Sequence, residues 1–229
     1  MSRLALRSRE EEQMDAADLP PETLAAVLAD LAQVNTLTLA RRPTLAFLAR
    51  ALKGRRSFSL LDVGSGEGDM LRAIARWAAK RGIEARLVGV DLNPNAAPAA
   101  RAATPAGLPI DYRTGDYADQ PESFDLIVSS LVTHHMSEDQ LDRYLRFSEA
   151  RAARAWLVND LHRHRLAYAG YPLLARAMRW HRIVREDGTL SIARSFRPAE
   201  WHAILARAGI ADARVVRRFP FRLCVERLR

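Results

Sequence analysis

The stretch Phe58–Met70, FSLLDVGSGEGDM, constrains the fold more than any other part of the chain. A short apolar run leads into Asp62, glycines then occupy alternate positions from 64 to 68, and a helical apolar pattern begins at Met70. A strand, a glycine loop and a helix in this order open a nucleotide-binding βαβ unit. Glycines allow positive φ and close approach of a ligand, and the new helix presents unpaired N–H groups to it.

The acids beside the glycines discriminate between ligands. A dinucleotide fingerprint reads G-x-G-x-x-G, whereas Asp62–Gly68 reads D-x-G-x-G-x-G. Asp62 and Glu67 would repel a pyrophosphate, but a ligand with positive sulfonium and amino groups, such as S-adenosylmethionine (SAM), would tolerate them. The alternative is a tight strand-to-helix turn that binds nothing, although three glycines beside two acids exceed what a turn needs.

Length and composition allow one large domain, or one domain with a cap, in 229 residues. No apolar run is long enough to span a bilayer, and the first 15 residues lack the apolar region of a secretory signal, so we expect a cytoplasmic protein. The single cysteine, Cys224, leaves no partner for an intrachain disulfide or a cysteine metal cluster. Its apolar neighbours predict a buried strand position.

The net charge of +8 permits binding to nucleic acid or to an anionic membrane surface. However, Lys53 and Lys80 are the only lysines, and the arginines are spread among alanines without a dense basic block. The charge therefore indicates a solvated basic surface and a compositional bias of the whole chain. We do not expect nucleic acid as a partner.

Alternating apolar segments and helical patterns predict an α/β chain beyond residue 55. Predicted helices precede the first strand, from Pro20 through Leu31 and over 42–52, with 34–37 as the connection. A helix over 162–180, kinked or restarted at Pro172, and a turn at Gly188 are predicted later. The predicted strands are 58–61, 85–91, 108–113, 124–130, 155–158, 215–219 and 221–225, and further helices follow at 70–80, 96–103, 138–153 and 198–208.

Two more segments fit contacts to a nucleoside. Asp91 ends the second strand, where a carboxylate can accept both ribose hydroxyl protons. The alternative role is a turn acid, because Asn93-Pro94-Asn95 follows. In Gly115-Asp116-Tyr117, the carboxylate can accept from an adenine amino group and the ring can offer a flat face.

The segments LDVGSGEG (61–68), GVDLN (89–93), GDY (115–117) and FDLIVSS (124–130) together resemble the class I SAM-dependent methyltransferases, over about residues 55–229. The resemblance implies a Rossmann-like α/β fold. Its seven-stranded sheet would be mostly parallel, with strand seven antiparallel, helices on both faces and a helical cap. We expect an N-terminal helical lid over 1–54 and a methyltransferase domain over 55–229, with a cap insertion around 161–195.

The resemblance also implies SAM as the cofactor, and no metal is expected. It places the methionine part of the cofactor on the glycine loop, the ribose at Asp91, the adenine at 116–117 and the sulfonium above 130–131. The predicted cofactor-binding residues are Asp62, Gly64, Ser65, Gly66, Asp91, Leu92, Asp116, Tyr117, Ser130 and Leu131.

The subgroup is indicated by shorter matches. THHM (133–136) resembles a stretch common in small-molecule methyltransferases, including ubiquinone and menaquinone enzymes. NDL (159–161), RSF (194–196) and PFRL (220–223) resemble bacterial enzymes encoded beside type III polyketide synthases. The resemblance implies methyl transfer to an oxygen or activated carbon of a phenolic, polyketide or quinone-like natural product, in secondary metabolism.

Such an acceptor must lose a proton, and histidine suits that role near neutral pH. His135 is the first candidate for the catalytic base, because it follows the strand nearest the methyl group; His134 and His162 come next, and then His181. A structural or surface role is the alternative for each of them. Tyr168, Tyr171, Trp180 and Arg163 would line the acceptor pocket or form the core of the cap.

Two other functions stay open. A nucleic-acid methyltransferase is disfavoured because amino-directed enzymes resemble one another in an N/D-P-P-Y/F motif where this chain has Ser129-Ser130-Leu131-Val132. A cytosine-C5 enzyme needs a nucleophilic thiol, and Cys224 lies in the wrong place. A catalytically silent SAM-binding partner subunit is the other alternative. We expect a small-molecule acceptor, no membrane span, and a monomer or homodimer.

Overall fold

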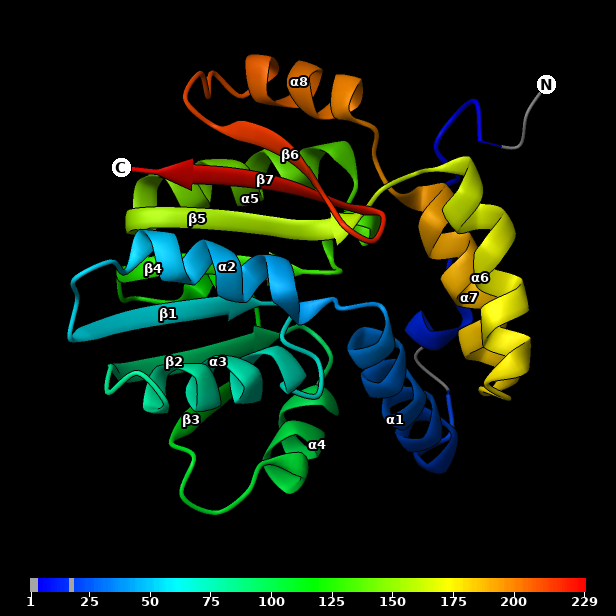
Figure 1. Cartoon of the computed structure of the whole chain (residues 1–229), viewed down its shortest axis with the longest axis horizontal. Coiled ribbons are helices and arrows are strands. Elements are labelled where there is room, and N and C mark those ends of the chain that lie inside the picture. Colours follow the sequence, from blue (N-terminus) through cyan, green and yellow to red (C-terminus); the bar gives the residue numbers. More distant parts are fainter. Residues whose placement is uncertain (1–3, 17–18) are drawn as a thin grey trace.

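The computed structural model describes residues 4–16 and 19–229 (Figure 1). Its strands are β1 (Ser57–Val63), β2 (Glu84–Asp91), β3 (Ile110–Thr114), β4 (Phe124–Ser130), β5 (Ala152–Leu161), β6 (Arg214–Arg218) and β7 (Arg222–Leu228). Its α-helices are α1 (Pro21–Leu37), α2 (Arg41–Ala51), α3 (Asp69–Ala79), α4 (Ala96–Ala103), α5 (Glu138–Arg151), α6 (Arg165–Ala177), α7 (Arg182–Arg194) and α8 (Pro198–Arg207). Short 3₁₀ turns are η1 (Gln13–Asp15), η2 (Tyr117–Asp119) and η3 (Thr133–His135).

All seven strands form one sheet in the order β3-β2-β1-β4-β5-β7-β6. β7 is antiparallel to β5 and β6, and the other paired neighbours are parallel, which confirms the predicted sheet. From β1 the chain continues to β2 and β3 on one side of β1, and it then returns to form β4 on the other side of β1. The carboxyl ends of β1 and β4 therefore flank a topological switch point, where open α/β sheets bind ligands.

Strand alternation distributes the core between two faces of the sheet. Leu60 packs with α2 and α3, whereas its neighbour Leu61 packs with α5 and α8. The helices α2, α3 and α4 cover the first face, and α5 and α8 cover the second (Figure 1). Trp156 of β5 and Trp201 of α8 are fully buried on the second face. Cys224 is buried in β7, as predicted.

A third apolar cluster lies beyond the carboxyl ends of the strands. Val27 of α1, Ala175 of α6 and Val184 of α7 are buried in it, and Figure 1 shows these three helices beside one another, away from the sheet. α2 lies within the predicted lid over 1–54, yet it packs on the sheet. The division into a lid, a methyltransferase domain over 55–229 and a cap insertion around 161–195 stays a prediction.

Three predicted features are wrong. Residues 34–37 form the last turn of α1 instead of a connection. The predicted helix over 162–180 starts only at Arg165, because β5 runs on to Leu161, and it does not restart at Pro172, which lies inside α6. Gly188 lies inside α7 and does not form a turn; a Cβ atom there would lie 2.3 Å from the Tyr171 ring, so glycine makes room for that ring.

In the described part of the chain, no helix combines the length and the hydropathy needed to cross a bilayer.

Replacing Gly188 by alanine tests this packing. The Tyr171 hydroxyl donates to the Val184 carbonyl at 2.8 Å, so the ring is not free to move aside. We expect Gly188→Ala to lower the free energy of unfolding by about 1–3 kcal/mol through overpacking. Gly170 in α6 is the matched control, since nothing lies within 4 Å of a Cβ atom there. Gly170→Ala should stabilise the helix by up to about 1 kcal/mol in urea unfolding. Equal effects of the two substitutions would contradict the packing.

Candidate functional site

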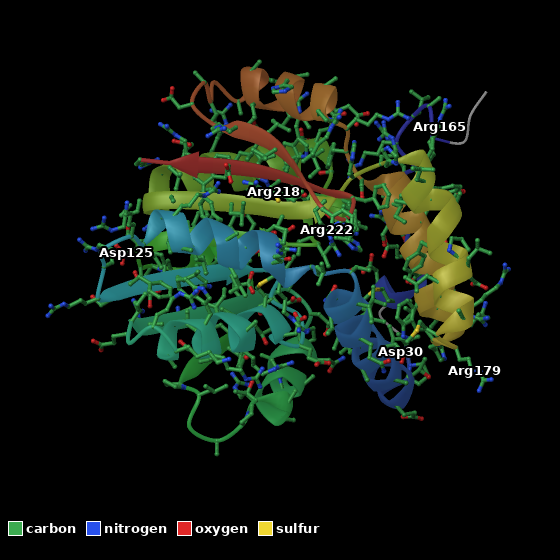
Figure 2. The ribbon with its side chains drawn as sticks, viewed as in Figure 1. Asp30, Asp125, Arg165, Arg179, Arg218 and Arg222 are labelled. Atoms are coloured by element: carbon green, nitrogen blue, oxygen red, sulfur yellow. The ribbon has the colours of Figure 1, made fainter. Side chains whose placement is uncertain are left out.

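A cavity of about 760 Å³ lies between the carboxyl ends of the strands and the inner faces of α1, α6 and α7. Its volume falls in the upper part of the range for small-molecule sites. The glycine loop, the ends of β2 and β4, η3 and the β6–β7 turn contribute to its wall. Figure 2 shows Arg222 at the start of β7, at the end of the sheet that faces α1 and α6.

The glycine loop adopts the backbone conformation that its sequence predicts. Gly64, Gly66 and Gly68 have φ values of 71°, 51° and 78°, which L side chains rarely adopt. A Cβ atom at Gly64 would lie 2.5 Å from the Val132 side chain, whereas a Cβ atom at Gly66 would meet nothing within 4 Å. Gly64 and Gly66 both line the cavity, so the main chain itself forms this wall.

Asp91 fixes the loop to the end of β2. Its Oδ2 accepts from the Gly66 N–H at 2.8 Å, and its Oδ1 accepts from the Asn93 N–H at 2.9 Å. The Gly64 N–H donates to the Val90 carbonyl at 2.8 Å, which adds a second link between the loop and β2. Asp91 also lines the cavity, so the position predicted for the ribose is available there. Asp91 also fills the alternative role of a turn acid, because the Asn93 N–H donates to the same carboxylate.

Acidic groups gather around the loop. Glu67, Asp69 and Asp91 line the cavity, and Ser65 lies between them in the wall. Asp62 lies beneath the loop and is not part of the lining; its Oδ1 has no hydrogen-bond partner among the described residues. Burial, and then the nearby carboxylates Asp69 and Asp91, raise the pKa of Asp62 well above its usual range. This end of the cavity suits a positively charged ligand.

Asp69 connects the loop to the N-terminal helices. Its Oδ2 accepts from the Arg41 guanidinium at 3.0 Å and from the Asn35 side chain at 3.2 Å. Asn35 lies in the last turn of α1, Arg41 opens α2 and Asp69 opens α3. One carboxylate therefore holds the end of α1 over the glycine loop.

The end of β4 forms the floor beside the loop. Ser130 and Leu131 line the cavity, and Leu131 has a φ of 62°, an uncommon value for a residue with a side chain. The Leu131 N–H donates to the Asn159 carbonyl at 3.0 Å, which ties it to β5. Backbone strain of this kind clusters at functional sites.

The segment predicted to hold an adenine divides into two parts. Tyr117 and Leu92 line the cavity, and Tyr117 is held edge-on against Phe147, with ring centroids 4.9 Å apart. Asp116 is not part of the lining, because its carboxylate caps η2 by accepting from the Ala118 N–H at 2.9 Å. The cofactor contacts assigned to the ten residues stay predictions.

Asp160 at the end of β5 orients His134. His134 is 2% exposed, and its Nδ1 lies 2.7 Å from the Asp160 Oδ1. The other carboxylate oxygen accepts from the Thr133 hydroxyl at 2.5 Å and from the His134 N–H at 2.9 Å. Burial opposes ionisation of this carboxyl, but the imidazole of His134 and these donors outweigh it and hold the pKa of Asp160 at about 2.

His135 is oriented by the N-terminal segment instead. Its Nδ1 lies 2.8 Å from the Asp15 carboxylate, and its Nε2 lies 3.8 Å from Glu12. Glu12 is buried between the two histidines, with His134 Nε2 at 3.7 Å from its Oε1. Burial opposes the charged form of His135, but Asp15 and Glu12 outweigh it and raise the pKa of this imidazole. His134, His135 and both carboxylates line the cavity.

Of the remaining histidines and cap residues predicted for the acceptor pocket, some line the cavity and others do not. His162 lines the cavity, whereas His181 caps α7 by accepting from the Ile183 N–H at 3.3 Å and lies outside the lining. Tyr171 is in the lining, but Tyr168 is not. The remaining two belong to packing: Trp180 is buried in the third cluster, and Arg163 donates to the Ser195 carbonyl at 2.8 Å.

Comparison with known proteins agrees with this geometry. A family model described as a methyltransferase domain matches residues 60–152. The match covers less than half of the chain, from β1 to the start of β5, and so includes the glycine loop, Asp91 and the two histidines. A ubiquinone biosynthesis O-methyltransferase of Azorhizobium caulinodans is 34% identical over 94 residues, which are 39% of this chain and 35% of that protein. The match thus spans about a third of the length of the curated relative.

Solved structures share the fold. The plantazolicin methyltransferase BpumL, in complex with S-adenosylhomocysteine (SAH), superposes with a TM-score of 0.64 at 14% identity, over 91% of this chain and 90% of that one. Magnesium protoporphyrin IX methyltransferase of Synechocystis PCC 6803, with bound SAH, gives a TM-score of 0.57 at 13% identity, over 94% and 90%. At these identities the likeness establishes the architecture of the methyltransferase domain and no more.

Several residues at the cavity have no sequence signal that assigns them there. Glu12 and Asp15 stand in a polar, charged N-terminal stretch, more than 100 positions from the histidines that they contact. Arg222 lines the cavity from β7, and it is fully buried with its Nη2 donating to Thr38 Oγ1 at 2.8 Å. Asp160 offered the one usable signal, because an acid that ends a parallel strand lies at the ligand-binding edge.

The environment of His162 predicts that the stability of the protein depends on pH. Burial, followed by the positive charge of Arg217 and further basic groups, lowers its pKa to about 4, from an ordinary value near 6.5. Between pH 4 and pH 6.5 this imidazole binds a proton in the unfolded chain but not in the folded chain. The stabilisation that comes from burying the neutral imidazole is therefore complete above pH 6.5 and is lost as the pH falls toward 4. From pH 7.5 to pH 5, the wild type should lose about 1–2 kcal/mol more stability than His162→Gln in urea unfolding. Parallel pH profiles would contradict the burial of a neutral imidazole.

Proposed function

We propose that the protein is a SAM-dependent methyltransferase that acts on an oxygen or an activated carbon of a small, largely apolar acceptor, of phenolic, polyketide or quinone-like type. One observation carries this proposal: an acid-lined glycine loop and a pair of carboxylate-bound histidines open into the same apolar cavity. The first fits a cationic cofactor, and the second suits an acceptor that must lose a proton.

The residues of the loop fit SAM. The space in front of Gly66 is open, the Asp91 carboxylate lies at the cavity wall, and Asp62 Oδ1 is a buried oxygen without a partner among the described groups. Glu67 and Asp69 add negative charge on the same side. The fold relatives support this assignment, because their structures hold SAM or SAH.

When bound, SAM supplies an electrophilic methyl group on a positively charged sulfur. The residues of this chain contribute alignment and exclusion of water, which are worth up to about 7–11 kcal/mol in favourable systems. Asp91 would orient the ribose, Tyr117 would support the adenine, and the Ser130–Leu131 floor would face the sulfur. The acceptor's nucleophilic atom would lie beside His134 and His135 and lose its proton there.

The walls of the cavity support an apolar acceptor. Leu31 and Val34 of α1 face it, together with Leu166 and Leu174 of α6 and Phe221 of the β6–β7 turn. Leu166 is 67% exposed, which a core position would not allow. The curated relative is named for a quinone pathway, which is consistent with an aromatic acceptor of this kind.

Asp91→Asn tests the cofactor site. Asparagine keeps one oxygen that can accept from the Gly66 N–H, and it loses the carboxylate charge together with the bond from the Asn93 N–H. The bond from the Gly64 N–H to the Val90 carbonyl does not depend on this side chain, so the loop should survive. We expect the Kd for SAM in isothermal titration to rise about 10–100-fold, that is about 1.4–2.8 kcal/mol. Asp111→Asn is the control. Asp111 is an exposed residue of β3 that does not line the cavity, so this substitution should leave the Kd unchanged. An unchanged Kd in Asp91→Asn, or no binding by the wild type, would remove the cofactor assignment.

His135→Gln tests the acceptor end. With SAM and a panel of flat phenols, the wild type should form SAH and a product heavier by one methyl group. The variant should lower kcat about 10²–10⁴-fold while the Kd for SAM stays within twofold, because His135 acts on the acceptor. His202→Gln, exposed on α8, is the control with wild-type turnover. Turnover in His135→Gln at the wild-type rate would exclude a role for this histidine.

A further inference from the structure

We propose that Glu12, His134 and His135 form a binding site for one divalent transition-metal ion in the wall of the cavity. The carboxylate and the two imidazoles each offer one ligand atom, and these atoms all lie within 4.8 Å of one another. No spacing in the sequence predicts this site, because Glu12 lies 122 positions before His134. The proposal goes beyond methyl transfer and does not need it, since metal binding can be measured without SAM or acceptor.

The free nitrogen atoms of both imidazoles point at one carboxylate. His134 Nε2 lies 3.7 Å from Glu12 Oε1, and His135 Nε2 lies 3.8 Å from Glu12 Oε2. Ligand atoms that share a metal at about 2.0–2.2 Å are about 3.0–3.5 Å apart. Each imidazole–carboxylate pair would therefore close by a few tenths of an ångström, and the set as a whole would contract from within 4.8 Å. Two histidines and one carboxylate are a ligand set of non-haem iron and zinc sites.

The opposite nitrogen of each ring is held by a different carboxylate. His134 Nδ1 lies 2.7 Å from Asp160, and His135 Nδ1 lies 2.8 Å from Asp15. A carboxylate accepts, so Nδ1 carries the proton and Nε2 keeps its lone pair for a metal. Metal-binding histidines almost always donate their second N–H in this way, which fixes the ring and raises its basicity. Both rings of this pair satisfy that condition.

Glu12 is also pre-positioned. It is 3% exposed, and its Oε1 accepts from the Ser191 hydroxyl at 2.9 Å, which leaves Oε2 directed at His135. Arg194 lies 3.8 Å from Oε1, but its Nη1 donates to the Glu10 carbonyl at 2.6 Å. Three carboxylates, those of Glu12, Asp15 and Asp160, therefore contact the imidazole pair. Arg194 offsets one of these negative charges, and a divalent cation would offset the other two.

The site opens to the cavity, because all three ligand residues line it and the His135 side chain is 26% exposed. Three protein ligands leave coordination positions free, as in catalytic metal sites. An oxygen atom of a bound small molecule can occupy such a position. With two nitrogen ligands, the site should prefer Zn²⁺, Co²⁺, Fe²⁺ or Mn²⁺ over Mg²⁺ and Ca²⁺.

The experiment measures metal on the purified chain without any affinity tag. After treatment with EDTA, the protein is dialysed against Zn²⁺ and counted by mass spectrometry, and a Co²⁺ titration is followed by visible absorption. The wild type should bind about one equivalent. Glu12→Gln and His135→Gln should each weaken binding at least 100-fold, and Asp15→Asn should weaken it about 10–100-fold by releasing the His135 ring.

His202→Gln is the matched control, because this histidine is exposed on α8 and far from the three ligands in the sequence; it should bind like the wild type. Circular dichroism and SAM titration of each variant show whether the fold and cofactor site survive, and partly exposed His135 gives a second variant if Glu12→Gln unfolds. A wild type that binds no stoichiometric Zn²⁺ or Co²⁺, or variants that bind as tightly as the wild type, would overturn the proposal. Failure of SAM binding alone would instead overturn the proposed function.

Discussion

The hydrogen bond from the Gly66 N–H to the Asp91 carboxylate is the contact on which the cavity depends. Three glycines with positive φ turn the chain away from β1, and only a fixed acceptor makes that turn a single conformation. The bond joins the loop after β1 to the end of β2, beside the switch point that β1 and β4 flank. Because Asp69 then holds Arg41 and Asn35, the same loop also determines where α1 ends.

The N-terminal segment completes the opposite side. The Ser8 N–H donates to the Ala193 carbonyl at 3.0 Å, and the N–H groups of Gln13 and Met14 donate to the Asp187 carboxylate at 3.1 and 2.9 Å. These bonds lay residues 8–14 along α7 and bring Glu12 to the histidines. Glu12 is thus a constituent of the cavity, although the sequence around it resembles an ordinary solvated stretch. The cost of burying Glu12 is offset by Ser191 and by the two imidazoles.

The sequence predicts best what local patterns encode. The glycine loop, Asp91 at the end of β2 and the 124–130 strand are each specified by neighbouring residues, and the structure has all three features. The turn predicted at Gly188 is wrong because the reason for that glycine is the Tyr171 ring, 17 positions away and on another helix. The role of Glu12 has no local signal for the same physical reason: its partners come from η3 and α7, and no periodicity links it to them.

The placement of exposed apolar side chains shows which part of the cavity is free for a ligand. Leu37, Leu92, Leu166, Leu174 and Phe221 are all at least 38% exposed and all line the cavity. None of these five side chains belongs to the third cluster, which packs through other residues of α1 and α6 such as Val27 and Ala175. Apolar surface that gathers in one concavity marks a binding site. An apolar acceptor would cover these side chains, whereas a nucleic-acid backbone would leave them exposed to water. The walls of the cavity therefore favour a small-molecule acceptor more strongly than the net charge of +8 favours a nucleic acid.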